Sequence, residues 1–483
     1  MSGKQMLAIL AVLLPSETGR AAFVPDFRVH PEDYTVLMVC DAARSPELKA
    51  FQPAGHGKFF VSGWKRADQF AAWVVTAPAG DDYAVNVLLR RRSGGALKLE
   101  VAAGGQQVSG LLPETAGGWR RQGLDGTLRL SKGPSTIELR LQGAGGQGEF
   151  DAEVLSVELV RRGVRERLHA AAMEMRSDTR DLQKAKYGLM FHWTSTIYPR
   201  HGDRKPYAEA VRDFNVDGLA DQVKDSGAGF VVLTTSHAFQ YFPAPIQSLE
   251  KVLPGRTSQR DLVADLADAL NKRGIKLWLY YHIGAMGDSE WMTASGFFET
   301  DTSRLFNNWC SIVSEVGNRY GKKLAGWWFD DGTTNYYYRS APWERLEKAA
   351  KAGNPDRLIG FNPWELPLAT EFQDYFCGEG FGDPGVGGTL PVGGDGRFPD
   401  GPYQGLQACA TLIVDGDWGH WKKDSEIGKP NKTAADMARY LNAFISHKSV
   451  PIFDLEIYQD GTCSPASIEL FKQARELLGP RIE

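Results

Sequence analysis

Two adjacent carboxylates follow an apolar run near the middle of the chain, in the stretch Leu324–Gly332. A buried parallel strand is apolar along its length and turns polar where the chain leaves the sheet. The pattern therefore predicts that Asp330 ends a strand at an active site, where its carboxylate would be the catalytic nucleophile. The alternative is that Asp330 and Asp331 only cap a turn, as Asp-Gly often does.

Other apolar runs are followed by polar and aromatic residues in the same way. These groups are His192 and Trp193, His237, Tyr280 to His282, Cys377 to Glu379, and Asp415 to His420. Taken singly, each histidine is more often a structural hydrogen-bonding residue than a functional one. Because the carboxyl ends of parallel barrel strands meet at one mouth, we expect the whole set to converge on a single site.

The elements that would position these groups form an α/β pattern. From Asp181 onward, apolar strands alternate with amphipathic helices, which indicates βα units and a parallel sheet. The predicted strands are 187–192, 230–235, 276–281, 324–329, 357–361, 374–377, 407–412 and 450–455. The predicted helices are 217–225, 262–273, 302–320, 343–352, 434–448 and 467–478. Eight strands predict a (β/α)8 TIM-like barrel.

The first part of the chain has a different pattern, with short runs of period two separated by glycine turns. Examples of such runs are 83–89, 97–101, 135–141 and 154–160. This pattern predicts an antiparallel β-sandwich, similar to the jelly-roll modules often attached to glycoside hydrolases. Either it binds sugar or it only caps its neighbour, and Trp64, Trp73 and Trp119 are more consistent with core than with a sugar platform. The expected division is 1–22 signal peptide, 23–162 sandwich, 163–180 linker helix and 181–483 catalytic barrel.

Composition excludes several classes of protein. The formal net charge of −4 provides no basic surface for nucleic acid. The 5 cysteines are odd in number and scattered, so neither a disulfide framework nor a zinc cage is expected. The apolar run near Met1 is too short to span a membrane and fits a signal peptide, so we expect export to the periplasm or the outside. A wrongly assigned start codon is the alternative.

The order of motifs from about 185 to 475 resembles glycoside hydrolase family 29, the retaining α-L-fucosidases. Tyr187–Trp193 resembles the first strand of that family, FGIFIHWG, and Trp328–Asp330 resembles its nucleophile strand, WFD. The other matching segments are Gly227–Thr235, Arg260–Leu262, Lys272–Lys276, Leu279–Tyr281, Glu290–Trp291, Trp418–Gly419 and Val450–Gly461.

The resemblance implies a retaining exo-glycosidase that hydrolyses terminal α-L-fucosides, or a closely related sugar, through an aspartyl glycosyl-enzyme intermediate. It implies Asp330 as the nucleophile and carbohydrate as the partner, with no cofactor and no metal. We assign the acid/base to Glu379, with Glu365 as the alternative. The residues expected to bind the substrate are His192, Trp193, His237, Tyr280, Trp418 and His420.

The chain departs from the family where the sugar would be held. Ala238 and Phe239 stand where the family has a second histidine and an acid that grip fucose hydroxyls. Thr194 and His420 stand where it has glycine and tyrosine. A site that loses a hydrogen-bonding partner for a sugar hydroxyl changes its discrimination between sugars strongly. The resemblance therefore supports the barrel and the nucleophile more strongly than it supports fucose as the sugar.

Three other functions stay open on the sequence. The first is an endo-acting fucan hydrolase in which His282 or His420 donates the proton. The second is a catalytically inactive, carbohydrate-binding barrel. The third is a metal-dependent hydrolase with Asp415, Asp417 and His420 as ligands, although their spacing matches no strong metal pattern.

Overall fold

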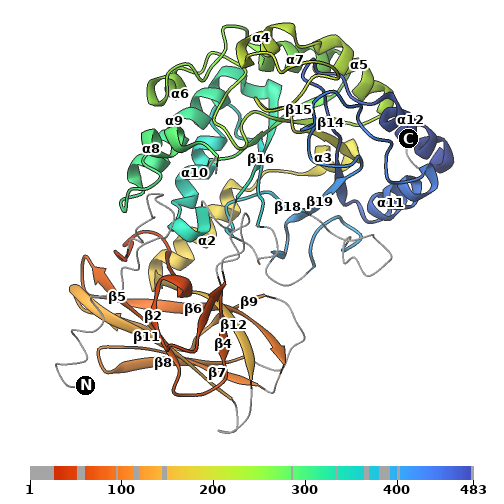
Figure 1. Ribbon diagram of the computed structural model, residues 1–483. Helices are drawn as coiled ribbons and strands as arrows, with labels where there is room; N and C mark the ends of the chain where they lie inside the picture. Colours follow the sequence, from red (N-terminus) through yellow and green to blue (C-terminus); the bar gives the residue numbers. More distant parts are fainter. Residues whose placement is uncertain are drawn as a thin grey trace.

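The computed structural model describes residues 27–51, 60–93, 96–112, 119–143, 150–283, 287–331, 336–363, 369–379, 392–399 and 403–479. The chain forms an antiparallel sheet region followed by a mixed α/β region, and the two lie one above the other (Figure 1). Among the described residues, no helix combines the length and apolar character needed to cross a bilayer. The proposed signal peptide and Glu365 lie outside the described residues.

The N-terminal region consists of two antiparallel sheets. The seven-stranded sheet contains β1 (Thr35–Met38), β3 (Lys49–Phe51), β4 (Phe60–Trp64), β6 (Asp81–Ser93), β9 (Arg120–Gly123), β10 (Leu128–Leu130) and β12 (Asp151–Arg161). The five-stranded sheet contains β2 (Ala43–Arg44), β5 (Phe70–Ala77), β7 (Leu97–Ala103), β8 (Gln106–Leu112) and β11 (Gly133–Gly143). The predicted period of two is present in β7, where buried and half-buried residues alternate.

The two antiparallel sheets share one hydrophobic core. Val75 and Val101 of the five-stranded sheet pack in the same cluster as Val87 and Val157 of the seven-stranded sheet. Trp64 and Trp73 are buried in this core, as the sequence predicted, and Trp119 is half-buried. Strand β12 is buried on both faces, because its other face packs toward the second region of the chain.

The second region is a nearly closed barrel of eight parallel strands in the order β17-β16-β15-β14-β13-β20-β19-β18. The strands are β13 (Gly188–Phe191), β14 (Phe230–Thr234), β15 (Lys276–Tyr281), β16 (Leu324–Phe329), β17 (Leu358–Phe361), β18 (Tyr375–Glu379), β19 (Gln407–Ile413) and β20 (Val450–Asp454). At the seam between β17 and β18, the Asp374 N–H donates to the Ile359 carbonyl over 2.8 Å. All eight predicted strands are present, within two residues at each end.

Large aromatic residues fill the inside of the barrel, where Trp278, Tyr280, Trp328 and Tyr375 belong to one buried cluster. They fit because glycines lie opposite some of them. A Cβ added to Gly326 would overlap the Trp278 ring, and one added to Gly360 would overlap the Tyr375 ring. The centre is therefore packed solid, and the open end at the strand termini is left for chemistry.

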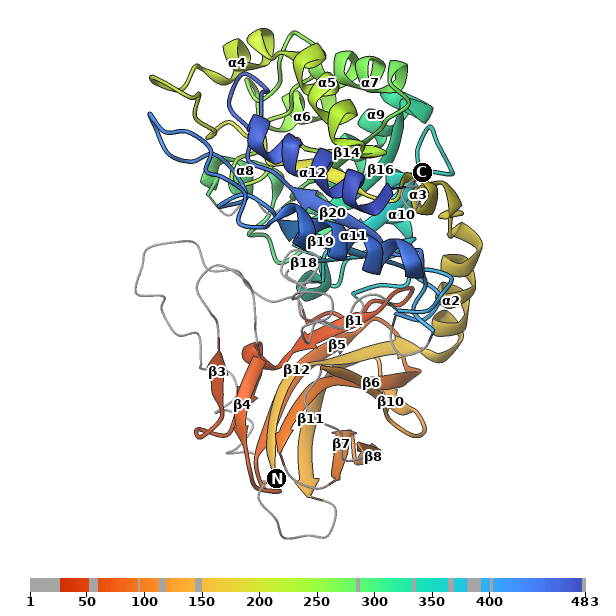
Figure 2. The ribbon, with the colours of Figure 1, turned by 90° about the vertical axis from the view of Figure 1, so that its right-hand side faces the viewer.

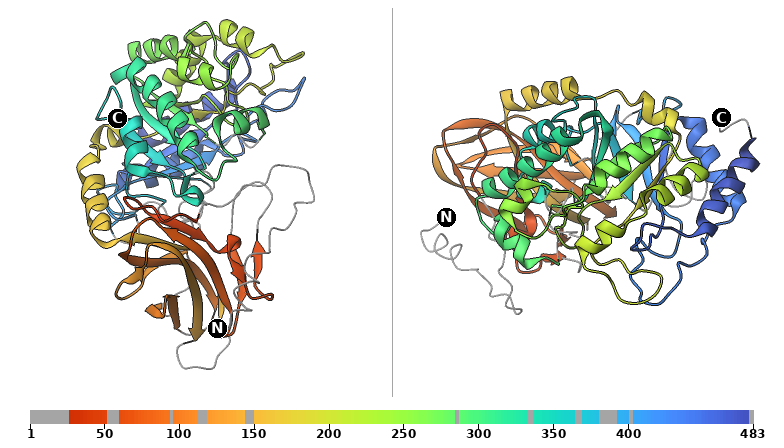
Figure 3. Two further views of the ribbon diagram at one scale, coloured as in Figure 1. Left: turned by 90° about the vertical axis from the view of Figure 1, so that its left-hand side faces the viewer. Right: turned by 90° about the horizontal axis from the view of Figure 1, so that it is seen from above.

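Helices surround most of the barrel, and the predicted ones are all present. They are α5 (Val216–Ser226), α7 (Leu262–Lys272), α9 (Ser303–Tyr320), α10 (Trp343–Ala350), α11 (Ala434–His447) and α12 (Pro465–Leu478). Four short helices were not predicted, namely α3 (Arg180–Ala185), α4 (Tyr207–Asp213), α6 (Gln247–Val252) and α8 (Ser289–Ser295). The charged segment after the sheets forms α2 (Arg162–Met175), which runs along the side of the junction between the two regions (Figures 2 and 3).

The sheet region lies against the side of the barrel that has fewest helices. Among the described residues, no α-helix lies between β17 and β18 or between β18 and β19. In Figure 2, β18 is the barrel strand nearest to β1 of the sheet region. The antiparallel sheets and α2 thus take the place that helices occupy elsewhere around the barrel.

Contacts across this junction gather on the short helix η4 (Tyr337–Arg339), which follows β16 and Asp330 in sequence. The Tyr337 hydroxyl bonds Ser156 Oγ at 2.7 Å and donates to the Glu158 carboxylate. The Tyr338 hydroxyl donates to Asp41, with distances of 2.8 and 3.0 Å to the two carboxylate oxygens. The sheet region therefore holds the segment that follows the predicted nucleophile.

Replacing Tyr337 by Phe is expected to lower the free energy of unfolding by about 1–3 kcal/mol, because it removes a donor from a buried carboxylate. Glu158 keeps its bonds to Arg121 and Asn86, so the fold should survive. Thermal denaturation checks this. Ser156→Ala, which removes only a neutral partner, should cost less, and an unchanged melting temperature for Tyr337→Phe would contradict the expectation.

Candidate active site

Side chains from six strand ends meet at the carboxyl end of the barrel. They are His192 after β13, His237 after β14, Tyr280 in β15, Asp330 after β16, Asn362 after β17 and Glu379 at the end of β18. The His192 ring centre lies 5.6 Å from that of His237, 5.0 Å from that of Tyr280 and 5.2 Å from that of Trp418. These four predicted substrate-binding residues are therefore neighbours.

Asp330 is held by the strand before it and the strand after it. Its N–H donates to the Tyr281 carbonyl over 3.1 Å, which extends the pairing of β15 and β16 by one residue. Asp330 is only 7% exposed, and its carboxylate accepts from the Tyr280 hydroxyl, from Asn362 Nδ2 at 2.9 Å and from the Asp331 N–H at 2.7 Å. Both oxygens are thus fixed in place.

The charge state of Asp330 follows from these contacts. Burial by itself would raise the pKa of its carboxyl. The charge of His282 and the hydrogen bonds from Tyr280 and Asn362 outweigh burial and hold the pKa below its usual value. Asp330 is therefore an ionised, oriented carboxylate, which is what a nucleophile requires.

Asn362 is a site residue that the sequence analysis did not identify. Its Nδ2 donates to Asp330 Oδ1 at 2.9 Å and to Glu379 Oε1 at 2.8 Å. Because both oxygens lie within 3 Å of one nitrogen, they can be no more than about 6 Å apart. The signal was present, since Asn362 is the first polar residue after the fifth predicted strand.

Glu379 has the opposite protonation state. It is half-buried and is the last residue of β18, where the sequence predicted it to follow the strand. Burial, and then the charges of Asp330 and Asp331, raise the pKa of Glu379 to about 9. When their environments drive the pKa values of two carboxyl groups apart, the ionised group can act as the base or nucleophile. The protonated group can then act as the acid.

Tyr280 and His192 complete the wall beside Asp330. The Tyr280 ring stacks on Trp328 with ring centres 5.0 Å apart, and burial followed by the Asp330 charge raises its pKa well above the usual value. The Tyr280 hydroxyl therefore stays a donor. His192 Nδ1 pairs with Asp454 at 2.7 Å, and burial lowers its pKa to about 4, so the ring is neutral, with Nε2 as its other hydrogen-bonding atom.

Asp331 is a partner of His282 and not only a turn residue. It is buried, adopts a left-handed backbone with φ 59°, and its carboxylate contacts His282 Nε2 directly. Burial would lower the pKa of His282, but the charge of Asp331 and its hydrogen bond outweigh burial and raise it. The resulting imidazolium adds positive charge beside Asp330.

Two predicted substrate-binding residues make their contacts elsewhere. Trp193 is buried, packs edge-on against Phe214 at 5.1 Å, and donates from Nε1 to the Gln459 carbonyl at 3.0 Å. His420 is also buried and bonds Glu456 at 3.2 Å through Nδ1. A direct role for either residue in sugar binding stays a prediction.

In the part of the chain that the structure describes, the candidate ligands for a metal ion differ from Asp415, Asp417 and His420, the set considered for the alternative of a metal-dependent hydrolase. Among the described residues, His282, Asp330 and Asp331 offer ligand atoms within 4.8 Å of one another. Their carboxylates already accept hydrogen bonds or pair with the histidine, so a cation would have to break these contacts. Asp415 is instead committed to Ser467 at 2.6 Å and to the Glu456 N–H at 2.9 Å.

Comparison with known proteins points to one family. Residues 160–475 match the family described as alpha-L-fucosidase. Tissue alpha-L-fucosidase from Bos taurus is 30% identical over 135 residues, covering 21% of this chain and 28% of the bovine protein. The Homo sapiens protein is 29% identical over 135 residues, with the same shares of 21% and 28%. The matched segment thus spans less than a third of these relatives.

Solved structures of similar architecture include an alpha-L-fucosidase from Lactobacillus casei in complex with alpha-L-fucose. It is 16% identical, with a TM-score of 0.45, covering 62% of this chain and 98% of that one. An alpha-L-fucosidase from Bacteroides thetaiotaomicron is also 16% identical, with a TM-score of 0.44 and coverage of 63% and 74%. The assignment rests on the match across residues 160–475: this chain belongs to the alpha-L-fucosidase family, glycoside hydrolase family 29.

Proposed function

We propose that this protein is a retaining exo-glycosidase that hydrolyses terminal α-L-fucosides, or a closely related sugar, through an aspartyl glycosyl-enzyme intermediate. The observation that carries the proposal is the amide nitrogen of Asn362, which bonds the carboxyl groups of both Asp330 and Glu379. A spacing of roughly 5–5.5 Å between the two carboxyl groups is typical of retaining enzymes, whereas inverting enzymes leave room for a water.

The chemistry follows from the two protonation states. The ionised Asp330 carboxylate attacks the anomeric carbon while protonated Glu379 gives its proton to the leaving oxygen, so the glycosidic bond breaks as the ester forms. Glu379, now a carboxylate, takes a proton from water, which attacks the same carbon and releases Asp330. The positive His282 and the Tyr280 hydroxyl favour the return of negative charge to Asp330.

Fewer observations support the identity of the sugar than support the type of reaction. His192, His237 and Trp418 would meet its hydroxyls and its apolar face. Ala238 and Phe239 cannot supply the grip that the family's histidine and acid provide, and Phe239 is 37% exposed. We therefore extend the proposal to sugars related to L-fucose.

An inactive carbohydrate-binding barrel is the less favoured candidate. A decayed site would have no need for a buried, ionised aspartate beside an acid whose pKa is raised to about 9, since both are costly to bury. The intact pair of Asp330 and Glu379 favours catalysis.

Hydrolysis of 4-nitrophenyl α-L-fucoside, followed by proton NMR, tests the proposal. We expect release of nitrophenol, with the α anomer of the sugar appearing first, because double displacement retains configuration. A panel of aryl glycosides of related L- and D-sugars identifies the preferred ring. The β anomer appearing first would contradict retention, and binding of fucose without turnover of any glycoside would favour the inactive barrel.

A further inference from the structure

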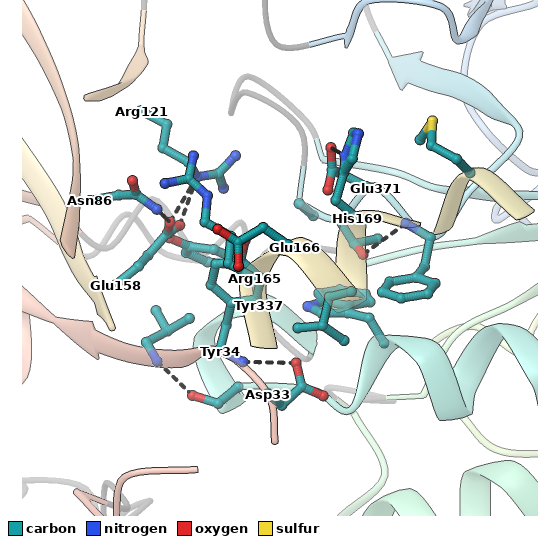
Figure 4. Close-up of a pocket in the computed structure, with 18 of the residues that line it drawn as sticks. Asp33, Tyr34, Asn86, Arg121, Glu158, Arg165, Glu166, His169, Tyr337 and Glu371 are labelled. Atoms are coloured by element: carbon teal, nitrogen blue, oxygen red, sulfur yellow. Dashed lines mark hydrogen bonds and ion pairs between the residues drawn. The ribbon is translucent and has the colours of Figure 1, made fainter. Parts of the chain in front are cut away.

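A cavity lies away from the catalytic residues, where the antiparallel sheets, α2 and the barrel meet (Figure 4). Its volume is about 890 Å³, within the range of sites that hold small molecules. None of the six strand-end residues that meet at the active site lines it. We call it the junction pocket.

One wall of the junction pocket is a fixed polar cluster. Arg121 Nε donates to both oxygens of Glu158 at 2.9 Å, and Asn86 Nδ2 donates to the same carboxylate at 3.1 Å. Tyr337, from the segment after β16, bonds the other side of Glu158. Because Glu158 is only 2% exposed and fully engaged, this wall is ordered in advance of any ligand.

The opposite wall comes from α2, which presents polar side chains one turn apart. Arg165, Glu166 and His169 line the pocket, and His169 Nδ1 bonds the Glu371 carboxylate at 2.9 Å. Arg165 and Glu166 are exposed and form no hydrogen bond or ion pair with another described residue. Figure 4 shows Arg165 reaching toward Arg121 and Glu158. The Arg165 guanidinium, a hydrogen-bond donor, and the Glu166 carboxylate, an acceptor, are therefore available to a ligand beside the cluster of Arg121 and Glu158.

The floor of the pocket adds one acid and one phenol. The Asp33 carboxylate accepts the Tyr34 N–H at 2.8 Å, and burial raises its pKa to about 7. Burial also raises the pKa of the Tyr34 hydroxyl to about 12, so that group stays a donor. Apolar side chains, among them Leu168, Met173 and Phe372, also line the pocket.

The chemistry of this lining selects the class of ligand. Arginines and acids are balanced, so neither a simple anion nor a simple cation would find a single-sign field. A sugar hydroxyl both donates and accepts, and the C–H face of a pyranose packs on apolar side chains. We propose that the junction pocket is a non-catalytic site for a short uncharged saccharide, with Arg165 and Glu166 as direct contacts.

The choice of a saccharide as the ligand rests on the proposed function. An enzyme that degrades glycans would bind a branched substrate more tightly if a second site bound another part of that substrate. Two weak sites on one molecule raise the local concentration of substrate at the catalytic mouth. The N-terminal sheets would then have a binding role as well as a covering one.

The test measures binding and not turnover. The full chain is titrated with lactose and with N,N′-diacetylchitobiose, two disaccharides that lack fucose, in excess L-fucose that fills the catalytic mouth. We expect saturable binding by calorimetry and saturation-transfer NMR. Arg165→Ala and Glu166→Gln should each weaken it about tenfold, the effect of one lost hydrogen bond.

Matched controls lie on the same helix. Arg162→Ala and Glu174→Gln change exposed residues of α2 that do not line the pocket, so they should leave the affinity unchanged. Because this experiment measures binding, its outcome does not depend on whether the protein hydrolyses fucosides. The junction-pocket proposal and the proposed function can therefore be contradicted independently. The junction site is overturned if neither disaccharide binds, if Arg165→Ala and Glu166→Gln leave the affinity unchanged, or if inorganic sulfate binds in place of the sugars.

Discussion

Asp330→Asn is expected to lower kcat for 4-nitrophenyl α-L-fucoside by at least about three orders of magnitude. The amide matches the carboxylate in size, but it cannot attack the anomeric carbon or carry its negative charge. Added azide should restore part of the turnover by attacking the opposite face, giving a glycosyl azide of inverted configuration. Steady-state kinetics and NMR of the product measure both effects.

The neighbouring acid provides the control for this variant. Asp331→Asn removes the charge paired with His282 and should reduce activity far less, because Asp331 pairs with the histidine, whereas Asp330 accepts the hydrogen bond from the bridging amide of Asn362. Circular dichroism and thermal melting establish that both variants fold. An active Asp330→Asn enzyme, or an Asp331→Asn enzyme that loses as much activity, would remove Asp330 from the role of nucleophile.

Glu379→Ala is expected to reduce hydrolysis of fucosyl disaccharides by about 10²–10⁴-fold, the usual contribution of a general acid. Activated aryl fucosides should lose much less in the first step, because their leaving group needs no proton. Azide should restore turnover here with retained configuration, the reverse of its effect in Asp330→Asn. Glu209→Ala, at an exposed position on α4, is the control. Equal losses on both substrate classes would point to a different acid.

The pH profile gives the same assignment independently. Activity needs protonated Glu379, so it should fall as the pH rises through about 9, the raised pKa of this group. It also needs ionised Asp330, whose pKa is held below its usual value, so the acid limb should lie below about pH 4. Glu379→Ala should lose the alkaline limb and keep the acid one.

Much of this site followed from local patterns in the sequence. The sequence pattern placed four residues at strand termini, namely Asp330, His192, His237 and Tyr280. The pattern is a run of apolar residues long enough for a buried strand that ends at the first polar group. Parallel strands in a barrel share one direction, so their carboxyl ends must gather on one side. Proximity of these groups was therefore predictable from the strand pattern alone.

Only the tertiary structure determined which of these side chains contact one another and which protonation state each one has. A single asparagine after a strand is common, and the role of Asn362 depends on β16 pairing with β17 on one side and β18 lying across the seam on the other. Trp193 and Trp418 look alike in sequence, yet one ring turns into the core and the other lies beside His192. Orientation of this kind depends on packing against distant residues.

The sequence by itself determined the two regions, the strands and the position of Asp330 at a strand end, because each depends on residues close together in the chain. The fold decided the pKa of Glu379, the pairing of His282 with Asp331, and the junction pocket between sheets and barrel. Those properties arise from burial and from charges on segments far apart in sequence, and only packing brings such segments together.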